Sequence, residues 1–134
     1  MPMPTQLVTE PPRLSGLLKL EEDPSYCREE VTVLAGNGSD RELHTGTIVG
    51  RITASGKVVD LALAGADGSQ TVYGVLLTNT TAPDGVDATG VVLVRGPAIV
   101  ADIALIYPAG ATAPQKATIN AALATLGIVL RTGV

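Results

Sequence analysis

Few residues in this sequence could carry out acid–base or nucleophilic chemistry. His44 is the only histidine, and Ser39 and Asp40 lie close enough along the chain to sketch a serine–histidine–acid arrangement. The chain has no Gly-x-Ser-x-Gly pattern, which would hold a nucleophilic serine at a tight turn between a strand and a helix. His44 instead precedes Thr45-Gly46, a context that predicts a turn at the surface. We therefore expect no catalytic residues and no enzymatic activity.

Metal and cofactor sites are equally hard to assemble. A structural zinc site needs about four nitrogen or sulfur ligands, whereas the chain has one histidine and one cysteine, Cys27. The acidic runs at residues 21–23 and 29–30 are typical of solvated charges rather than paired catalytic carboxylates. The stretch "GNGSDR" has Arg41 where a dinucleotide-binding fingerprint needs its third glycine. We expect neither a metal nor a cofactor.

One lysine supports a different hypothesis. Lys57 follows the turn Ser55-Gly56, and small β-domains that carry lipoate or biotin attach the group to a lysine at a hairpin tip. The neighbours Gly56 and Val58 differ from the residues that usually flank such a lysine. The pattern favours an ordinary turn lysine.

The composition limits the class of protein. A chain of 134 residues is long enough for one domain with its own core. Hydrophobic residues make up 46% of it but aromatic residues only 2%, so valine, leucine, isoleucine and alanine must form the core. The net charge of −4 and the scarcity of aromatic side chains argue against nucleic-acid binding. No apolar run approaches the length of about 20 residues that a membrane span needs, and the proline-rich start does not resemble a signal peptide.

The chain divides into an arm and a domain. Residues 1–28 hold five of the nine prolines, which remove backbone donors and favour extended geometry. This composition predicts a flexible proline-rich N-terminal arm over residues 1–28 and a β-rich domain over residues 29–134. Apolar pairs between the prolines suit an arm that becomes ordered against a partner.

The domain is predicted to be mainly β, with one short C-terminal helix. Several short β-branched runs alternate with glycine-rich turns, a pattern typical of all-β domains. The expected strands are Glu29–Ala35, Gly46–Ala54, Lys57–Leu63, Thr71–Thr78, Gly90–Arg95 and Ala98–Leu105. Gly96-Pro97 separates the last two, because proline cannot donate to a central ladder.

The C-terminal part changes to a helical period. Thr112 followed by Gln115 has the spacing of a capping box, and Pro114 lies in the first turn, where proline is tolerated. These signals predict a helix over about residues 113–126, which ends at Gly127. A short strand, Ile128–Arg131, should then return to the sheet.

The order of these segments resembles the lambda-type phage head decoration protein family. The resemblance rests on "REEVTVLAGNG", "LHTGTIVGRIT", "GSQTVYGVLL", "DATGVVLVRGPAIV" and "GATAPQKATINAALATLGIVLR". It covers about residues 28–131. The strongest part is "VVLVRGPAIVAD", followed by an alanine-rich helix and "LGIVLR".

The resemblance implies a fold and a function. Family members have a β-clip-like fold with an extended N-terminal arm, and they are not enzymes. They assemble as homotrimers at the three-fold sites of the expanded icosahedral head. There they cement the shell of the major capsid protein against the pressure of the packaged DNA. The expected location is therefore the exterior of the virion capsid, and the host cytoplasm before assembly, with no membrane or nucleic-acid partner.

Two groups of residues are candidate contacts. An arm with apolar pairs suits binding by strand addition, where backbone hydrogen bonds give affinity and alternate side chains fill pockets. The candidates in the capsid-binding arm are Thr5, Gln6, Leu7, Val8, Leu14, Leu17 and Leu18. Arg95 and Asp102 are candidates for salt bridges at a rim or a subunit boundary, although plain surface charges would explain them equally well. The alternative function is a small β-module that binds a peptide or a glycan.

Overall fold

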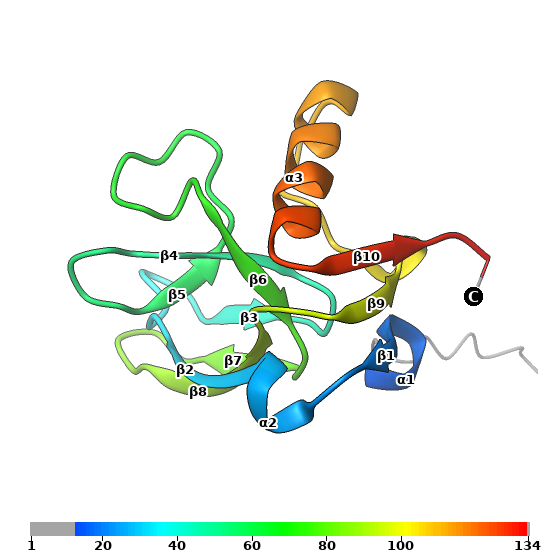
Figure 1. The fold of residues 1–134 in the computed structure, drawn as a ribbon. Coiled ribbons are helices and arrows are strands. Elements are labelled where there is room, and N and C mark those ends of the chain that lie inside the picture. Colours follow the sequence, from blue (N-terminus) through cyan, green and yellow to red (C-terminus); the bar gives the residue numbers. More distant parts are fainter. Residues whose placement is uncertain (1–12, 134) are drawn as a thin grey trace, which may run out of the picture.

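Short β-branched runs separated by glycine turns build most of the computed structural model, which describes residues 13–133 (Figure 1). The elements along the chain are α1 (Leu14–Leu17), β1 (Leu18–Glu21), α2 (Pro24–Cys27), β2 (Arg28–Val33), β3 (Arg41–Leu43), β4 (Ile48–Arg51), β5 (Val58–Asp60), β6 (Val72–Leu76), β7 (Thr80–Ala82), β8 (Ala88–Leu93), β9 (Ala98–Ala101), the 3-10 helix η1 (Asp102–Ala104), α3 (Ala113–Thr125) and β10 (Ile128–Arg131). Between residues 13 and 133, none of the helices has the length and apolarity to cross a membrane.

Five strands close into a barrel in the order β2-β5-β4-β6-β8. The predicted hairpin is present, because β4 and β5 pair antiparallel with Gly50 opposite Val59. Side chains that alternate inward fill the barrel, with Val33, Val49 and Leu76 fully buried. Gly74 lies in β6, where an added Cβ would come within 2.3 Å of the Leu93 carbonyl oxygen. Only glycine allows β6 and β8 to approach so closely at this point.

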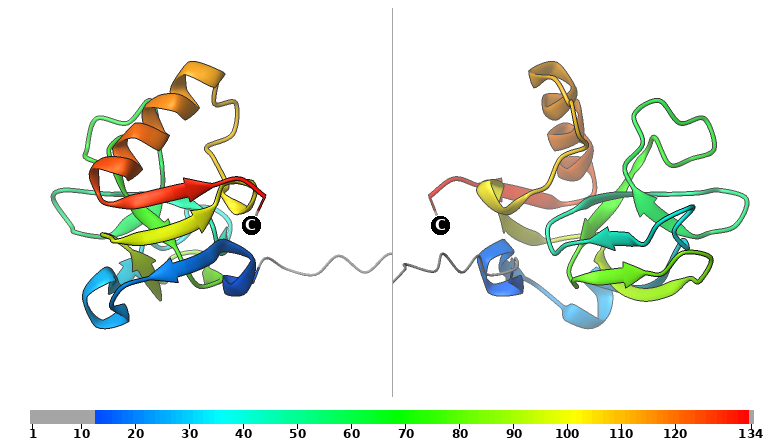
Figure 2. Two further views of the ribbon diagram at one scale, coloured as in Figure 1. Left: turned by 45° about the vertical axis from the view of Figure 1, so that its right-hand side comes forward. Right: turned by 180° about the vertical axis from the view of Figure 1, so that it is seen from behind.

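The other main sheet has the order β1-β9-β10, and Figure 2 shows its three strands side by side. β1 pairs antiparallel with β9, whereas β10 pairs parallel with it. A parallel connection needs a long crossover, and α3 supplies it. The short strands β3 and β7 form a separate two-stranded sheet. A second apolar cluster joins the three-stranded sheet to the barrel and to α3.

The helix α3 forms where the sequence predicts it. Thr112 and Gln115 make both hydrogen bonds of the capping box, which satisfies backbone donors at the helix start. Ile119 and Leu123 are buried against the core. Gly127 ends the helix with a φ of +85°, a left-handed conformation that favours glycine. The strand Ile128–Arg131 follows as predicted.

The mainly β fold with one short C-terminal α-helix is confirmed. Several predicted strands are longer than the observed ones. Ala98–Leu105 is an example, because Asp102–Ala104 turn into η1 after Ala101. Residues 14–28 also differ from the expected flexible arm, since α1, β1 and α2 pack on the domain. Residues 1–12 lie outside the described part of the chain, so the arm remains a prediction there. The β-clip description also remains a prediction.

Candidate functional site

The arm candidates fall into two groups. Thr5, Gln6, Leu7 and Val8 lie outside the described residues. Leu14, Leu17 and Leu18 belong to the folded domain: Leu17 is 0% exposed, and the other two pack partly buried against the same cluster. The backbone hydrogen bonds between β1 and β9 hold this segment in place. These three leucines therefore tie the base of the arm to the domain, and Leu17 presents no surface to a partner in this structure.

The surface beside this base is unusually apolar. α1 packs against η1, so the chain enters the described domain next to Asp102–Ala104. In η1, the side chain of Ile103 is 88% exposed, the highest value among the exposed large hydrophobic residues of the described chain. Ile103 lies in the middle of this short 3-10 turn, after β9 has ended at Ala101. A single exposed isoleucine is common on protein surfaces, so its significance depends on its apolar neighbours.

Ile103 borders a groove of about 840 Å³ between η1, α3 and the end of β10. Leu130 and Tyr107 add apolar surface, and the Tyr107 hydroxyl donates to Asn120 Oδ1 at 2.6 Å. The C-terminal end of the described chain, which borders the groove, lies on the same side of the molecule as α1 (Figure 1). We call this region, with Ile103, Tyr107 and Leu130, the η1 groove.

Asp102 also lines the η1 groove. Its Oδ2 accepts a hydrogen bond of 2.8 Å from the Thr132 hydroxyl. Within residues 13–133 it forms no ion pair. The structure thus places Asp102 at the rim of an open groove, while its predicted role in a subunit or rim contact remains a prediction.

Arg95 lies elsewhere, in a network of side chains within the domain. Its Nη2 is 2.6 Å from Glu29 Oε1, and its Nη1 donates to the Tyr26 carbonyl oxygen. The guanidinium also stacks on the Tyr26 ring at 5.0 Å from the centroid. Glu29 Oε2 accepts a 2.7 Å hydrogen bond from the Tyr73 hydroxyl. The structure therefore shows Arg95 joining β2 to the end of β8, whereas Asp102 hydrogen-bonds to Thr132.

This network makes stability depend on pH. The hydrogen bond from Arg95, followed by that from Tyr73, lowers the pKa of the Glu29 carboxyl below its ordinary value. A carboxyl with a lowered folded-state pKa stabilises the fold above its unfolded-state pKa. That stabilisation is lost as the pH falls through the folded-state value.

We expect Glu29→Gln to be less stable than the wild type near neutral pH. The difference in stability should shrink as the pH falls, because Glu29 of the wild type becomes protonated. Urea unfolding midpoints of both proteins, measured from about pH 7 down to about pH 3, check this. A difference between the two midpoints that stays constant over this range would contradict the pKa shift.

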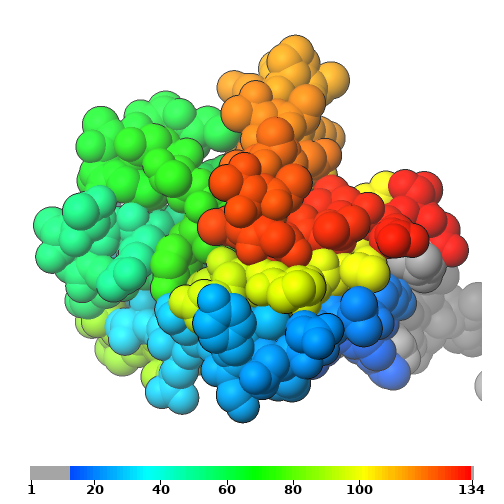
Figure 3. Space-filling view, viewed as in Figure 1, coloured from blue at the N-terminus to red at the C-terminus, as the bar shows by residue number. Residues whose placement is uncertain are grey.

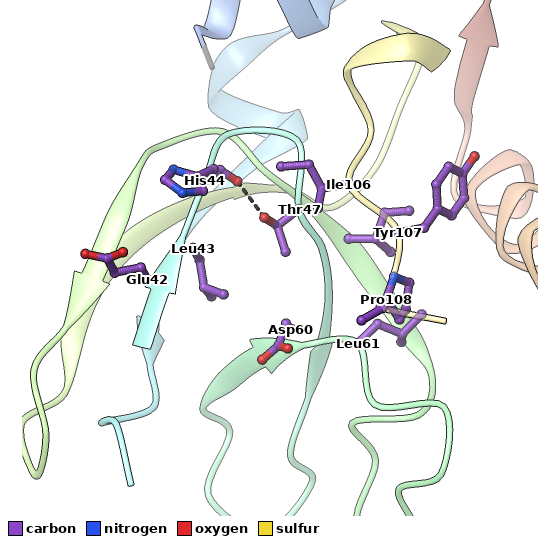
Figure 4. Close-up of a pocket in the computed structure, with 11 residues that line it drawn as sticks. Glu42, Leu43, His44, Thr47, Asp60, Leu61, Ile106, Tyr107 and Pro108 are labelled. Atoms are coloured by element: carbon purple, nitrogen blue, oxygen red, sulfur yellow. Dashed lines mark hydrogen bonds between the residues drawn. The ribbon is translucent and has the colours of Figure 1, made fainter. Parts of the chain in front are cut away.

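His44 lines a pocket of about 270 Å³ between β3, β4 and residues 106–109 (Figure 4). Its side chain is exposed, and its carbonyl oxygen accepts a 2.7 Å hydrogen bond from the Thr47 hydroxyl. Asp40 accepts from the backbone N–H of Asp84 instead of a histidine ring. The geometry does not assemble the serine–histidine–acid arrangement sketched from Ser39, His44 and Asp40.

The remaining chemical candidates also have structural partners. Lys57 Nζ is 2.7 Å from Asp87 Oδ2, so its ammonium group is held in an ion pair. Cys27 is buried at the end of α2. Within residues 13–133, no three His, Cys, Asp or Glu side chains are grouped so that they could hold a metal ion.

Sequence reasoning missed Ile103 and the η1 groove. The segment "VADIALIY" is continuously apolar apart from Asp102, and its pattern predicts that the strand Ala98–Leu105 continues through Ile103. Asp102 is the residue that indicates the end of this strand, because aspartate is depleted within strands and common at helix starts.

Comparison with known proteins agrees with this architecture. The family model described as bacteriophage lambda head decoration protein D matches residues 7–128. The match therefore includes Leu7 and Val8 of the arm, all strands of the barrel, and α3. No curated protein matches the chain. The family model covers all but six residues at each end, and the chain therefore belongs to the phage lambda head decoration protein D family.

Proposed function

We propose that this protein binds the expanded phage head as a homotrimer at three-fold sites and cements the shell of the major capsid protein against the pressure of packaged DNA. The family match over residues 7–128 carries this proposal. The arm and the η1 groove form the face that meets the capsid. The virion exterior is then the working location, and the host cytoplasm is the location before assembly.

The groove supports binding by burial of apolar surface. Ile103, Tyr107 and Leu130 form an apolar surface beside the point where the arm enters the domain. Ile103 is 88% exposed, and fully burying a side chain of this kind yields about 1.5–3 kcal/mol before the costs of association are subtracted. Many copies on one closed shell then act together, since linked contacts gain effective concentration.

The cementing effect follows from mass action. A ligand that binds the intact shell but not the ruptured shell stabilises the intact state in proportion to its occupancy and affinity. A trimer at a three-fold site contacts several capsid subunits at once. Rupture must break these contacts together, so the decorated head withstands more heat or pressure.

Co-sedimentation with expanded, decoration-free heads of the same phage tests the proposal. We expect saturable binding and heads that rupture at a higher temperature. Ile103→Asp should weaken binding by about tenfold or more, because an unpaired carboxylate would be buried in the contact. Val86→Asp is the matched control, since Val86 is 56% exposed in a loop away from the groove. Folded protein that fails to bind heads would contradict the proposal and favour the alternative of a peptide- or glycan-binding module.

The glycan alternative has little structural support. Glycan sites use exposed aromatic rings, and of the three tyrosines only Tyr26 is largely exposed, at 59%. Tyr73 and Tyr107 are partly buried, and their hydroxyls are hydrogen-bonded within the domain.

A further inference from the structure

The outer face of the three-stranded sheet carries an uncovered row of aliphatic side chains. Leu20 in β1 lies opposite Ile99 in β9, and Ile99 lies opposite Val129 in β10. Leu20 is 50% exposed and Val129 is 46% exposed. Figure 3 shows this side of the molecule, where β9 runs as a yellow band between β10 above and β1 below. We call Leu20, Ile99 and Val129 the outer row.

The opposite face of the same sheet packs on the domain, except where Leu130 also borders the η1 groove. Val100 in β9 pairs with Leu18 in β1 on one side and with Leu130 in β10 on the other. Val100 belongs to the larger core cluster, and the two leucines pack against it. Ile99 and Val129 alternate with these inward-facing residues, and a register shift between Leu18 and Leu20 sets Leu20 opposite Ile99, so the outer row points away from that core. Three aligned branched side chains on one face are a patch rather than a scattered apolar residue.

Charges of opposite sign flank the row on its two edge strands. Along β1 and the residue after it, Glu22 has the same parity as Leu20 and is exposed. Along β10, Arg131 has the same parity as Val129 and is also exposed. Neither forms an ion pair with another residue in the range 13–133. On the β1 side of the face, the negatively charged Glu22 therefore lies beside Leu20. On the β10 side, the positively charged Arg131 lies beside Val129.

We infer that the outer row is the contact between copies of this chain, with the β10 side of one copy against the β1 side of the next. This inference rests on the proposed function, because it assigns the surface that joins the subunits of the trimer. The two sides differ in charge and complement each other, which suits a head-to-tail contact. Head-to-tail contacts form a closed ring when the rotation between subunits closes. The η1 groove and the arm remain available for the capsid.

Val129→Asp tests the apolar part of the contact. We expect the association constant of the oligomer, measured by light scattering across a dilution series, to fall by about tenfold or more. Val86→Asp is the control, with a similar exposure on a different surface. Circular dichroism and unfolding midpoints confirm that both variants are folded. An unchanged oligomer in folded Val129→Asp would overturn the inference.

A charge exchange tests the direction of the contact. Glu22→Arg and Arg131→Glu should each weaken association, because each places like charges together across the contact. The double variant should recover at least part of the loss, since the pair is restored with reversed signs. Additive losses in the double variant would overturn the head-to-tail arrangement.

Head binding by the same variants separates this inference from the proposed function. If the wild type forms trimers through the outer row but never binds heads, the proposed function fails and the inference stands. If the wild type binds heads, yet cross-linking on the heads yields the same oligomer for Val129→Asp as for the wild type, the inference fails and the proposed function stands.

Discussion

Replacing Leu17 with alanine will lower the free energy of unfolding by about 2–5 kcal/mol, the range for removing a fully buried leucine side chain. Leu17 is 0% exposed and belongs to the same core cluster as Val100 and Leu123. The loss combines the transfer free energy of the removed atoms with the cost of the cavity that remains. Urea unfolding followed by circular dichroism measures the change.

Leu20→Ala is the matched control for this experiment. Leu20 is three residues further along the same segment and is half exposed, so its truncation should cost less than about 1 kcal/mol in the isolated subunit. At protein concentrations where the subunits are dissociated, similar small losses for both variants would mean that Leu17 is not a core residue. That result would return residues 14–20 to the flexible arm predicted from their composition.

Deleting residues 1–12 should abolish head binding without lowering the stability of the domain, whereas deleting residues 1–20 should impair both. The first deletion ends before α1 and leaves Leu17 and β1 in place. The second removes the buried Leu17 and three of the four residues of β1, the strand that pairs with β9. Sedimentation with expanded heads and unfolding midpoints, measured for both deletions, give the two results separately.

A double substitution refines the deletion experiment. Leu7→Ser with Val8→Ser keeps the length and the prolines of the arm but removes its apolar pair. If strand addition fills pockets with these side chains, this variant should bind heads as poorly as the deletion of residues 1–12. Full binding by the deleted protein would contradict a capsid-binding role for the arm and leave the η1 groove as the contact.

Local signals were sufficient for the elements whose contacts are close along the chain. The α3 helix has its capping box at Thr112 and Gln115 and its stop at Gly127, so it was predicted within one residue at its end. The β4–β5 hairpin was visible because its two strands are β-branched and flank the turn at Ser55-Gly56.

Other elements depend on distant partners and could not be predicted. β1 is a strand because it pairs with β9, far along the chain, whereas its own neighbourhood is rich in proline and charge. The same contact buries Leu17, which looked like an exposed anchor of the arm. The three-residue strands β3 and β7 are too short for a periodic pattern. Arg95 pairs with Glu29 within the domain, and nothing local in the sequence identifies Glu29 as its partner.

The position of β9 between β1 and β10 also constrains how the chain folds. One neighbour of β9 comes from the start of the described chain and the other follows α3. During synthesis, β1 cannot pair until residues 98–101 of β9 have been made. The other edge of β9 stays unpaired until β10 has been completed at residue 131. Contacts of such high contact order close late and slow the overall folding rate. The barrel strands between them can pair earlier, so we expect the nascent protein to complete its three-stranded sheet as a final step.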